Sequence, residues 1–349
     1  MAFHIPFEYL LRTVQLFIKC ILLMRAKLFF IVALVMSLTS CLQSECLTVL
    51  DTEIGFTAKT SAITKSIYHN QTFSTNEMFD VWGFYSNQGD FSEFSETSTS
   101  NFMGGLTMEW TTDASHSVQS AWRSRNYRYY WPVSGKVGFY ALYPAGIANV
   151  AAPQYRGNGL QIDNYTIDMT NKFTDLMYAY QVGSLDTHVL SIDFKHALSQ
   201  LEFNVQLNYA PAGYTLYVTE IDIQNVDLSA QFNYVQSQDV CKWTNNTDNQ
   251  TDVIKYSDNF VMLTDESKTY ASAMVMMPQT LSSETSVRIE YKLVDAEGNV
   301  TWGETVKQLT SMQNEWKVSA KYSYLLNFSI DESTMMPTVD VDLNNVLNY

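Results

Sequence analysis

The chain has 349 residues, of which 46 % are hydrophobic, and its 36 acidic side chains against 21 Lys and Arg give a formal net charge of −15. This acidic balance argues against binding to nucleic acid or to anionic lipid through charge, because both select basic surfaces. The length is sufficient for two domains of ordinary size.

The N-terminal region predicts a leader that is cleaved at a lipid-anchored cysteine. A basic start at residues 24–27 precedes an apolar block at 28–38, which suits a signal-peptide core and is shorter than the roughly 20 residues of a spanning helix. Leu38-Thr39-Ser40-Cys41 then fits a lipobox, in which the chain is cut before the cysteine and the cysteine is acylated. The alternative is a buried helix ending in a loop, but the basic flank, apolar core, small residues and cysteine follow the order of a signal peptide.

Residues 1–40 are therefore predicted to be a leader and lipoprotein signal peptide. Arg12 and Lys19 interrupt the apolar residues before Met24, so that either translation starts at Met24 or the signal has a long leading region. Removal of the leader, with its four basic residues and one acidic one, leaves a charge of about −18. Of the cysteines beyond Cys41, Cys46 and Cys241 either pair or remain two free thiols.

Alternation of apolar and polar residues is the dominant pattern of the rest of the chain. It is clear at residues 201–207, 287–293 and 324–330, which each predict a strand with one buried and one solvated face. A further strand is predicted from Val137 to Tyr143, closed by Pro144.

Two local signals refine this pattern. Leu216 and Val218 alternate, and Ile221 resumes out of phase, which predicts a β-bulge near Thr219 and Glu220. Residues 296–299, Ala-Glu-Gly-Asn, predict a turn before a strand that starts at Val300.

The chain as a whole is predicted to be all-β. It contains 22 Tyr, 19 Phe and 7 Trp, a composition that favours strands, and few stretches have a helical period. Short strands separated by turns predict two β-sandwich domains, an N-terminal one at residues 41–186 and a C-terminal one at 187–349.

No motif for catalysis, a cofactor or a metal is found. The chain lacks HExxH, GxSxG and GxxxxGK[ST], and no cysteine or histidine spacing indicates a metal site. Residues 244–252 are rich in Asn, Thr and Asp but lack the glycine and closing Glu of a calcium loop. The segment FKHALSQ around His196 contains no Asp or Glu, and Asp163, Asp168 and Asp175 are interpreted as solvated strand ends. The chain is predicted not to be an enzyme.

One aromatic cluster admits two interpretations. Trp110, Trp122 and Trp131 lie close in sequence to several tyrosines and arginines. Flat rings beside guanidinium groups bind sugars or protein partners, whereas alternate rings also fill the core of a sandwich. The core interpretation is favoured, because large aromatic residues mostly serve cores.

The segments in their order resemble the fimbrillin family of Bacteroides-type bacteria, which comprises lipoprotein pilins and related Mfa-like adhesins. The resemblance covers essentially all of residues 41–349, and it rests on the lipobox and on these segments: Ile54-Gly55-Phe56-Thr57, Phe79 to Phe84, Tyr129 to Pro132, Gly138 to Ala141, Asp175 to Ala179, Phe194 to Ser199, Met277-Pro278-Gln279 and Trp316-Lys317.

The resemblance implies two transthyretin-like β-sandwich domains, export to the outer membrane, and assembly by strand exchange. In such pilins a protease removes the first strand of the N-terminal domain, and a strand from a neighbouring subunit fills the groove. The strand to be lost is expected at residues 54–59, with processing near Lys59 or Lys65. The donated strand is expected at 339–343, where Val339, Val341 and Leu343 alternate with aspartates. Both segments also fit ordinary edge strands.

One departure from the family concerns processing. Pilins matured by an arginine-specific protease need an arginine after the first strand, but the first arginine after Cys41 is Arg123. This leaves three alternatives: another protease acts, the protein stays anchored at the filament base, or it is not a filament subunit.

The sequence thus predicts a surface-exposed outer-membrane lipoprotein that is a fimbrial subunit or fimbria-associated adhesin. Its expected partners are other fimbrial subunits, a receptor or glycan on a host or bacterial surface, and the membrane through the lipid on Cys41. The alternative is a glycan-binding surface lipoprotein that does not polymerise, with Trp110, Trp122 and Trp131 as the residues that contact sugar.

Overall fold

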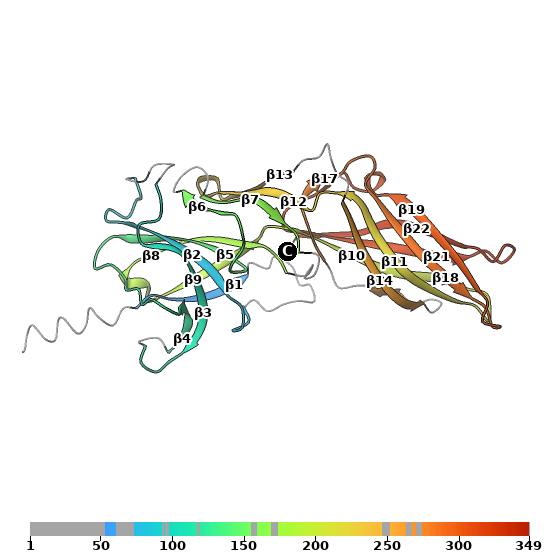
Figure 1. Ribbon diagram of the computed structural model, residues 1–349, viewed down its shortest axis with the longest axis horizontal. Coiled ribbons are helices and arrows are strands. Elements are labelled where there is room, and N and C mark those ends of the chain that lie inside the picture. The colour runs from blue at the N-terminus through green and yellow to red at the C-terminus, as the bar shows by residue number, and fades with distance from the viewer. Residues whose placement is uncertain are drawn as a thin grey trace, which may run out of the picture. The chain divides into compact units, whose positions relative to one another are not determined.

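The structure is a computed structural model, and the regular secondary structure in the described part of the chain is almost entirely β-strand (Figure 1). No helix among these residues is long and apolar enough to cross a membrane. The prediction of an all-β chain is confirmed. The described residues are 53–60, 73–92, 94, 98–116, 119–154, 159–168, 174–245, 252–262, 267–269 and 274–348.

The N-terminal strands close into a barrel in the order β1-β4-β3-β2-β5-β8-β9. Neighbours pair antiparallel except β1 and β9, which run parallel. Closure leaves no free edge within the barrel. The bounds are β1 Gly55–Thr60, β2 Phe79–Ser86, β3 Met103–Thr112, β4 Ser120–Ser124, β5 Lys136–Tyr143, β8 Met177–Gly183 and β9 Val189–His196.

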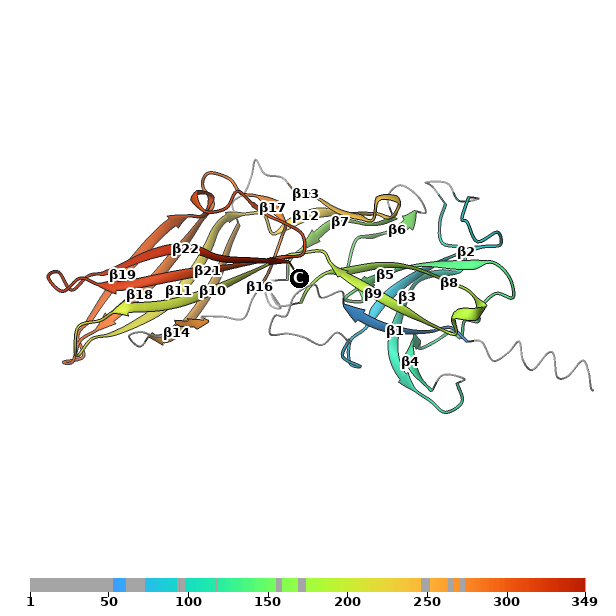
Figure 2. The same cartoon turned by 180° about the vertical axis from the view of Figure 1, so that it is seen from behind.

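Two further sheets form a β-sandwich with one shared core. Their orders are β15-β10-β21-β22, with β16 also paired to β10, and β14-β11-β18-β19. The strands β10, β21 and β22 run side by side in both views (Figures 1 and 2). The bounds are β10 Ser199–Tyr209, β15 Ser267–Thr269, β16 Met274–Met276, β21 Ala320–Ile330, β22 Pro337–Asn348, β11 Thr215–Val226, β14 Asp252–Met262, β18 Ser286–Val294 and β19 Val300–Gln308.

Smaller elements complete the fold. A four-stranded sheet has the order β13-β12-β7-β6, and β17 pairs with β20. The remaining strands are β6 Val150–Gln154, β7 Gly159–Thr166, β12 Ser229–Val235, β13 Val240–Thr244, β17 Gln279–Thr280 and β20 Glu315–Trp316, and the short 3₁₀ turns are η1 Leu185–Thr187, η2 Gln236–Gln238 and η4 Leu309–Ser311.

The apolar residues that alternate with polar ones in the sequence form the core of the sandwich. In β10, β18 and β21 every second side chain is buried, as expected for strands with one solvated face. Register shifts between Val218 and Glu220, against both β14 and β18, confirm the predicted bulge. The predicted strand at 137–143 is β5, and Gly298 occupies the predicted turn with φ +85°.

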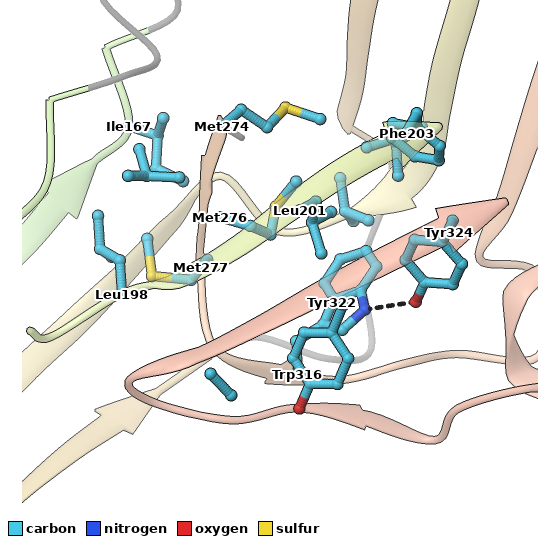
Figure 3. Close-up of a cluster of buried hydrophobic side chains, with 14 of the residues drawn as sticks. Ile167, Leu198, Leu201, Phe203, Met274, Met276, Met277, Trp316, Tyr322 and Tyr324 are labelled. Carbon is cyan, nitrogen blue, oxygen red and sulfur yellow. Dashed lines mark hydrogen bonds between the residues drawn. The ribbon is translucent and has the colours of Figure 1, made fainter. Parts of the chain in front are cut away.

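Aromatic residues anchor this core at one end of β21 (Figure 3). Trp316 is fully buried, and its indole N–H donates a hydrogen bond of 3.0 Å to the hydroxyl of Tyr324. Tyr324 in turn stacks on Phe203 with ring centroids 5.6 Å apart. The polar atoms of these large rings are thereby satisfied inside the core.

The strands on either side of residue 186 share sheets. Strand β9, which follows the predicted domain boundary, belongs to the barrel beside β1, and β7 pairs with β12 from the C-terminal half. Strand β5 is buried on both faces, because one side faces the barrel interior and the other joins the core under β7 and β12. The division of the chain into domains at 186 stays a prediction.

Candidate functional site

The first strand, β1, is a closing element of the barrel. It lies between β4 and β9, and its parallel register with β9 runs from Gly55 opposite Val189 to Thr60 opposite Phe194. Such a pairing joins segments far apart in sequence. Removal of β1 would therefore open the barrel between β4 and β9.

One face of β1 is buried in the barrel core. Ile54, Phe56 and Ala58 are at most 5 % exposed, as expected for residues that face the same way. The ring of Phe56 packs edge-on against Phe139 at 5.3 Å and against Phe79 at 6.4 Å between centroids. Full burial of a side chain of this size stabilises the fold by about 2–3 kcal/mol.

The predicted processing residue Lys59 lies on the opposite, exposed face of β1. Its side chain is 52 % exposed and its amine lies 3.8 Å from a carboxylate oxygen of Asp193 on β9. The backbone at Lys59 is held in the β-ladder, so that cleavage there requires local opening of the strand. Lys65, Cys41 and Cys46 lie outside the described residues.

The predicted donor strand is part of β22, an edge strand in its own sheet. Among the described residues β22 pairs only with β21. Val339 and Val341 are 5 % and 8 % exposed and point into the sandwich core, which Leu343 also contacts, whereas Asp340 and Asp342 point outward. The apolar alternation at 339–343 is thus satisfied within one chain.

The tryptophans predicted as ligand contacts are mostly core residues. Trp122 and Trp131 are each 3 % exposed and donate their indole N–H groups to the backbone carbonyls of Glu77 and His188. They cannot present a ring face to a ligand, so that this part of the sugar-binding interpretation is wrong. Trp110 is half-buried and packs on Trp122 with centroids 4.4 Å apart.

A buried pair of titratable residues was missed by sequence reasoning. Asp175 is 8 % exposed and its Oδ2 lies 2.5 Å from Nδ1 of His196, so its interpretation as a solvated strand end is wrong. Asp163 and Asp168 are exposed. Because Asp175 precedes β8 and His196 ends β9, only the β8–β9 pairing brings them together.

The segment that contains His196 also ties β9 and β10 to the loop before β21. The hydroxyl of Ser319 donates to the carbonyl of His196 at 2.7 Å, and the hydroxyl of Ser199 donates to the carbonyl of Lys317 at 2.8 Å. These contacts support a structural role for residues 194–199.

A polar cavity of about 680 Å³ lies beside the β5–β6 loop. The hydroxyl of Tyr143 donates a hydrogen bond of 2.7 Å to Glu77, and burial, followed by this bond, raises the pKa of Tyr143. Burial, followed by the charges of Asp175 and Asp168, also raises the pKa of Tyr165. The lining includes Glu77, Tyr143, Asn149, Asn164, Tyr165 and Asp168.

No group of three or more His, Cys, Asp or Glu within the described residues could hold a metal ion. Cys241 is a half-buried free thiol, and burial raises its pKa, which makes it a poor nucleophile.

This architecture defines an all-β protein built from a closed barrel and a β-sandwich. A family model described as fimbrillin-like matches residues 61–341, and the chain belongs to the fimbrillin-like family. The family is one of structural proteins and supports a fimbrial or adhesin-like function at the cell surface. No curated protein matches the chain.

Solved structures similar to the chain come from Bacteroides and Porphyromonas. A fimbrial protein from Bacteroides vulgatus superposes with a TM-score of 0.60 at 15 % identity, covering 85 % of this chain and 99 % of its own. The fimbrial anchor protein Mfa2 from Porphyromonas gingivalis has a TM-score of 0.30 at 11 % identity, covering 85 % of this chain and 100 % of its own. The first of these likenesses shows the fold.

Proposed function

We propose that the protein is a fimbrial subunit or fimbria-associated adhesin that is lipid-anchored at Cys41, exported to the outer membrane and assembled by strand exchange. The single observation that carries this proposal is the position of β1. This strand closes the barrel, and six consecutive residues of it pair with β9. A short strand near the start of the described residues that fills such a place can be exchanged for one from a neighbour.

The spacing of side chains in β22 suits the groove that β1 would leave. β1 and the residue before it bury Ile54, Phe56 and Ala58 at alternate positions, and β22 carries Val339, Val341 and Leu343 at the same spacing. In an exchanged state these side chains would replace those of β1, while backbone hydrogen bonds to β9 would provide most of the affinity.

Exchange also requires that β22 leave its own sheet. As an edge strand it has one partner, β21, among the described residues, and its departure would expose Phe328 and Leu326 opposite Val339 and Val341. The stability of the assembled state must therefore exceed that of the β21–β22 pairing within one chain.

The first test is the N-terminal residue and mass of the protein from sheared surface filaments and, separately, from washed outer membranes. Sheared material that begins beyond about Thr60 is the expected result for loss of β1. An acylated chain that begins at Cys41, found only in membranes, would contradict a role as a shaft subunit and would favour a filament-base anchor or a non-polymerising lipoprotein.

A second test asks which strand fills the groove. Ser191 on β9 is exposed and lies opposite Thr57 of β1. Cells that express Ser191→Cys and Asp342→Cys chains together, each with Cys241→Ser, should yield disulfide-linked dimers in sheared filaments. Asp295→Cys, in an exposed turn far along the chain from β22, is the matched control and should give none.

A further inference from the structure

Strand β19 carries apolar side chains on its outward face and polar or small residues on its inward face, which is the reverse of an ordinary sandwich strand. Its outward side chains include Val300, Trp302 and Val306, which are 48 %, 62 % and 51 % exposed. Its inward positions are Thr301, Gly303, Thr305 and Lys307, none of which adds an apolar side chain to the core. At Gly303 the ring of Tyr291 fills the inner side, since a Cβ there would lie 2.4 Å from that ring.

Trp302 is singular among the tryptophans. All seven lie in the described part of the chain, and Trp302 alone is exposed. Exposure of so large an apolar surface on a monomer marks an interaction site more often than a scattered small apolar residue does.

The ring of Trp302 is held in a cross-strand row. Tyr217 on β11, Lys292 on β18 and Trp302 on β19 are consecutive partners on the outer face of the sheet. The amine of Lys292 lies 4.9 Å from the centroid of Tyr217 and 5.7 Å from that of Trp302. A cation between two rings fixes their orientation and leaves an amine beside the exposed indole.

The next row of cross-strand partners places carboxylates beside Trp302 and Lys292. Glu220, Glu290 and Glu304 are consecutive partners on the same face. The guanidinium of Arg288 holds them, with Nη2 2.6 Å from Glu220 and Nη1 3.2 Å from Glu304, and it also binds Glu290 and Asp222. Glu304 is 56 % exposed and stands two residues from Trp302 on the same strand, so that its position is set before any ligand arrives.

We propose that the outer face of β11, β18 and β19 binds a neutral saccharide, which stacks an apolar ring face on Trp302. Sugar hydroxyls would donate to Glu304 and Glu290 and accept from Lys292. The proposal rests on the adhesive half of the proposed function and is independent of strand exchange.

The charge of this face favours a neutral saccharide over an anionic sugar or a second copy of the chain. Four carboxylates against Arg288 and Lys292 leave the face negative, which disfavours uronic, sialylated or sulfated sugars. The same sign, on a chain of net charge −15, disfavours a second copy. A protein interface core is depleted in charged residues, whereas here a charged row adjoins the only exposed tryptophan.

The test uses the full chain in detergent, probed with immobilised neutral oligosaccharides and with matched sialylated and sulfated ones. Binding to at least one neutral sugar is expected, with a change in tryptophan fluorescence that Trp302→Phe abolishes. Trp302→Ala should weaken binding by about tenfold or more and Glu304→Gln by about threefold, whereas Tyr127→Ala, which removes an exposed ring elsewhere, should leave affinity within about twofold.

Three results would overturn the proposal. They are the absence of binding to every sugar, a preference for the anionic sugars, and retention of affinity in Trp302→Ala. If binding instead falls in Asn164→Ala, the sugar site lies in the cavity beside β5 and not on this face. Because Trp302→Ala should still form the Ser191–Asp342 cross-linked dimer, failure of sugar binding and failure of strand exchange are distinguishable.

Discussion

Nδ1 of His196 lies 2.5 Å from Oδ2 of Asp175, and both side chains are largely buried, at 15 % and 10 % exposed. This contact joins the end of β9 to the residues before β8, while the backbone carbonyl of His196 accepts a hydrogen bond from Ser319 before β21. His196 is therefore a junction between three parts of the fold.

Replacement of His196 by Ala should destabilise the protein by about 2 kcal/mol, because Asp175 loses a hydrogen-bond partner in a buried position. Urea unfolding of the two proteins measures the difference in unfolding free energy. The neighbouring Lys195→Ala is a matched control: its ion pair with Asp239 is exposed, at 40 % and 60 %, and should contribute less than about 0.5 kcal/mol. Equal effects of the two substitutions would contradict the role given to the buried pair.

Substitution in β1 should test how firmly that strand closes the barrel. Phe56→Ala removes a ring that is 1 % exposed and contacts Phe79 and Phe139, and it should cost about 3–5 kcal/mol of unfolding free energy. Thr57→Ala, on the exposed face of the same strand, should change stability by less than about 0.5 kcal/mol. If β1 contributes little to the barrel, thermal and urea unfolding will not separate the two variants.

The parts of this fold that can be predicted from the sequence are the strands in which apolar and polar residues alternate. Residues 201–207 and 287–293 form strands with one buried face, and the phase change after Val218 is a bulge. The parallel pairing of β1 with β9 joins residues more than 130 positions apart, and no local pattern encodes it.

The candidate sites show the same limit. Composition alone does not separate a buried tryptophan from an exposed one, so that Trp122 and Trp302 look equally available until burial is known. The inverted polarity of β19 is visible in Val300-Thr301-Trp302-Gly303, but alternation does not reveal which face is inward. The position of Trp302 opposite Lys292, whose neighbours Tyr291 and Leu293 are buried, settles it.

The guanidinium of Arg288 should be the main electrostatic support of the β11–β18–β19 face. The hydrogen bonds that Arg288 donates to Asp222 first, and to Glu290 and Glu304, raise the pKa of Arg288, and Asp222 beneath it is 1 % exposed. Arg288→Ala leaves that carboxylate without its cation and should cost about 3 kcal/mol.

The comparison for Arg288 is Arg125, whose side chain is 76 % exposed and binds Glu109 at 2.6 Å. Arg125→Ala should cost much less than Arg288→Ala, because solvent screens an exposed pair. Urea unfolding in low and high salt provides the measurement. Salt should change the effect of Arg125→Ala more than that of Arg288→Ala, and the reverse order would contradict the buried character of the Arg288 cluster.

Alkaline pH should weaken the sandwich through Tyr324. Burial raises the pKa of Tyr324 to about 12, although the hydrogen bond from Trp316 acts in the opposite direction. The ordinary pKa is about 10, so between these values the unfolded chain releases a proton that the folded chain keeps. The stabilisation is complete below pH 10 and is lost as the pH rises through about 12, by up to about 3 kcal/mol.

Urea unfolding at a series of alkaline pH values, compared with Tyr324→Phe, isolates this contribution from those of the other buried tyrosines. The variant should be less stable than the wild-type chain near neutral pH, because Trp316 loses its acceptor, and the gap should narrow as the pH rises; a gap that stays constant would show that Tyr324 titrates alike in both states.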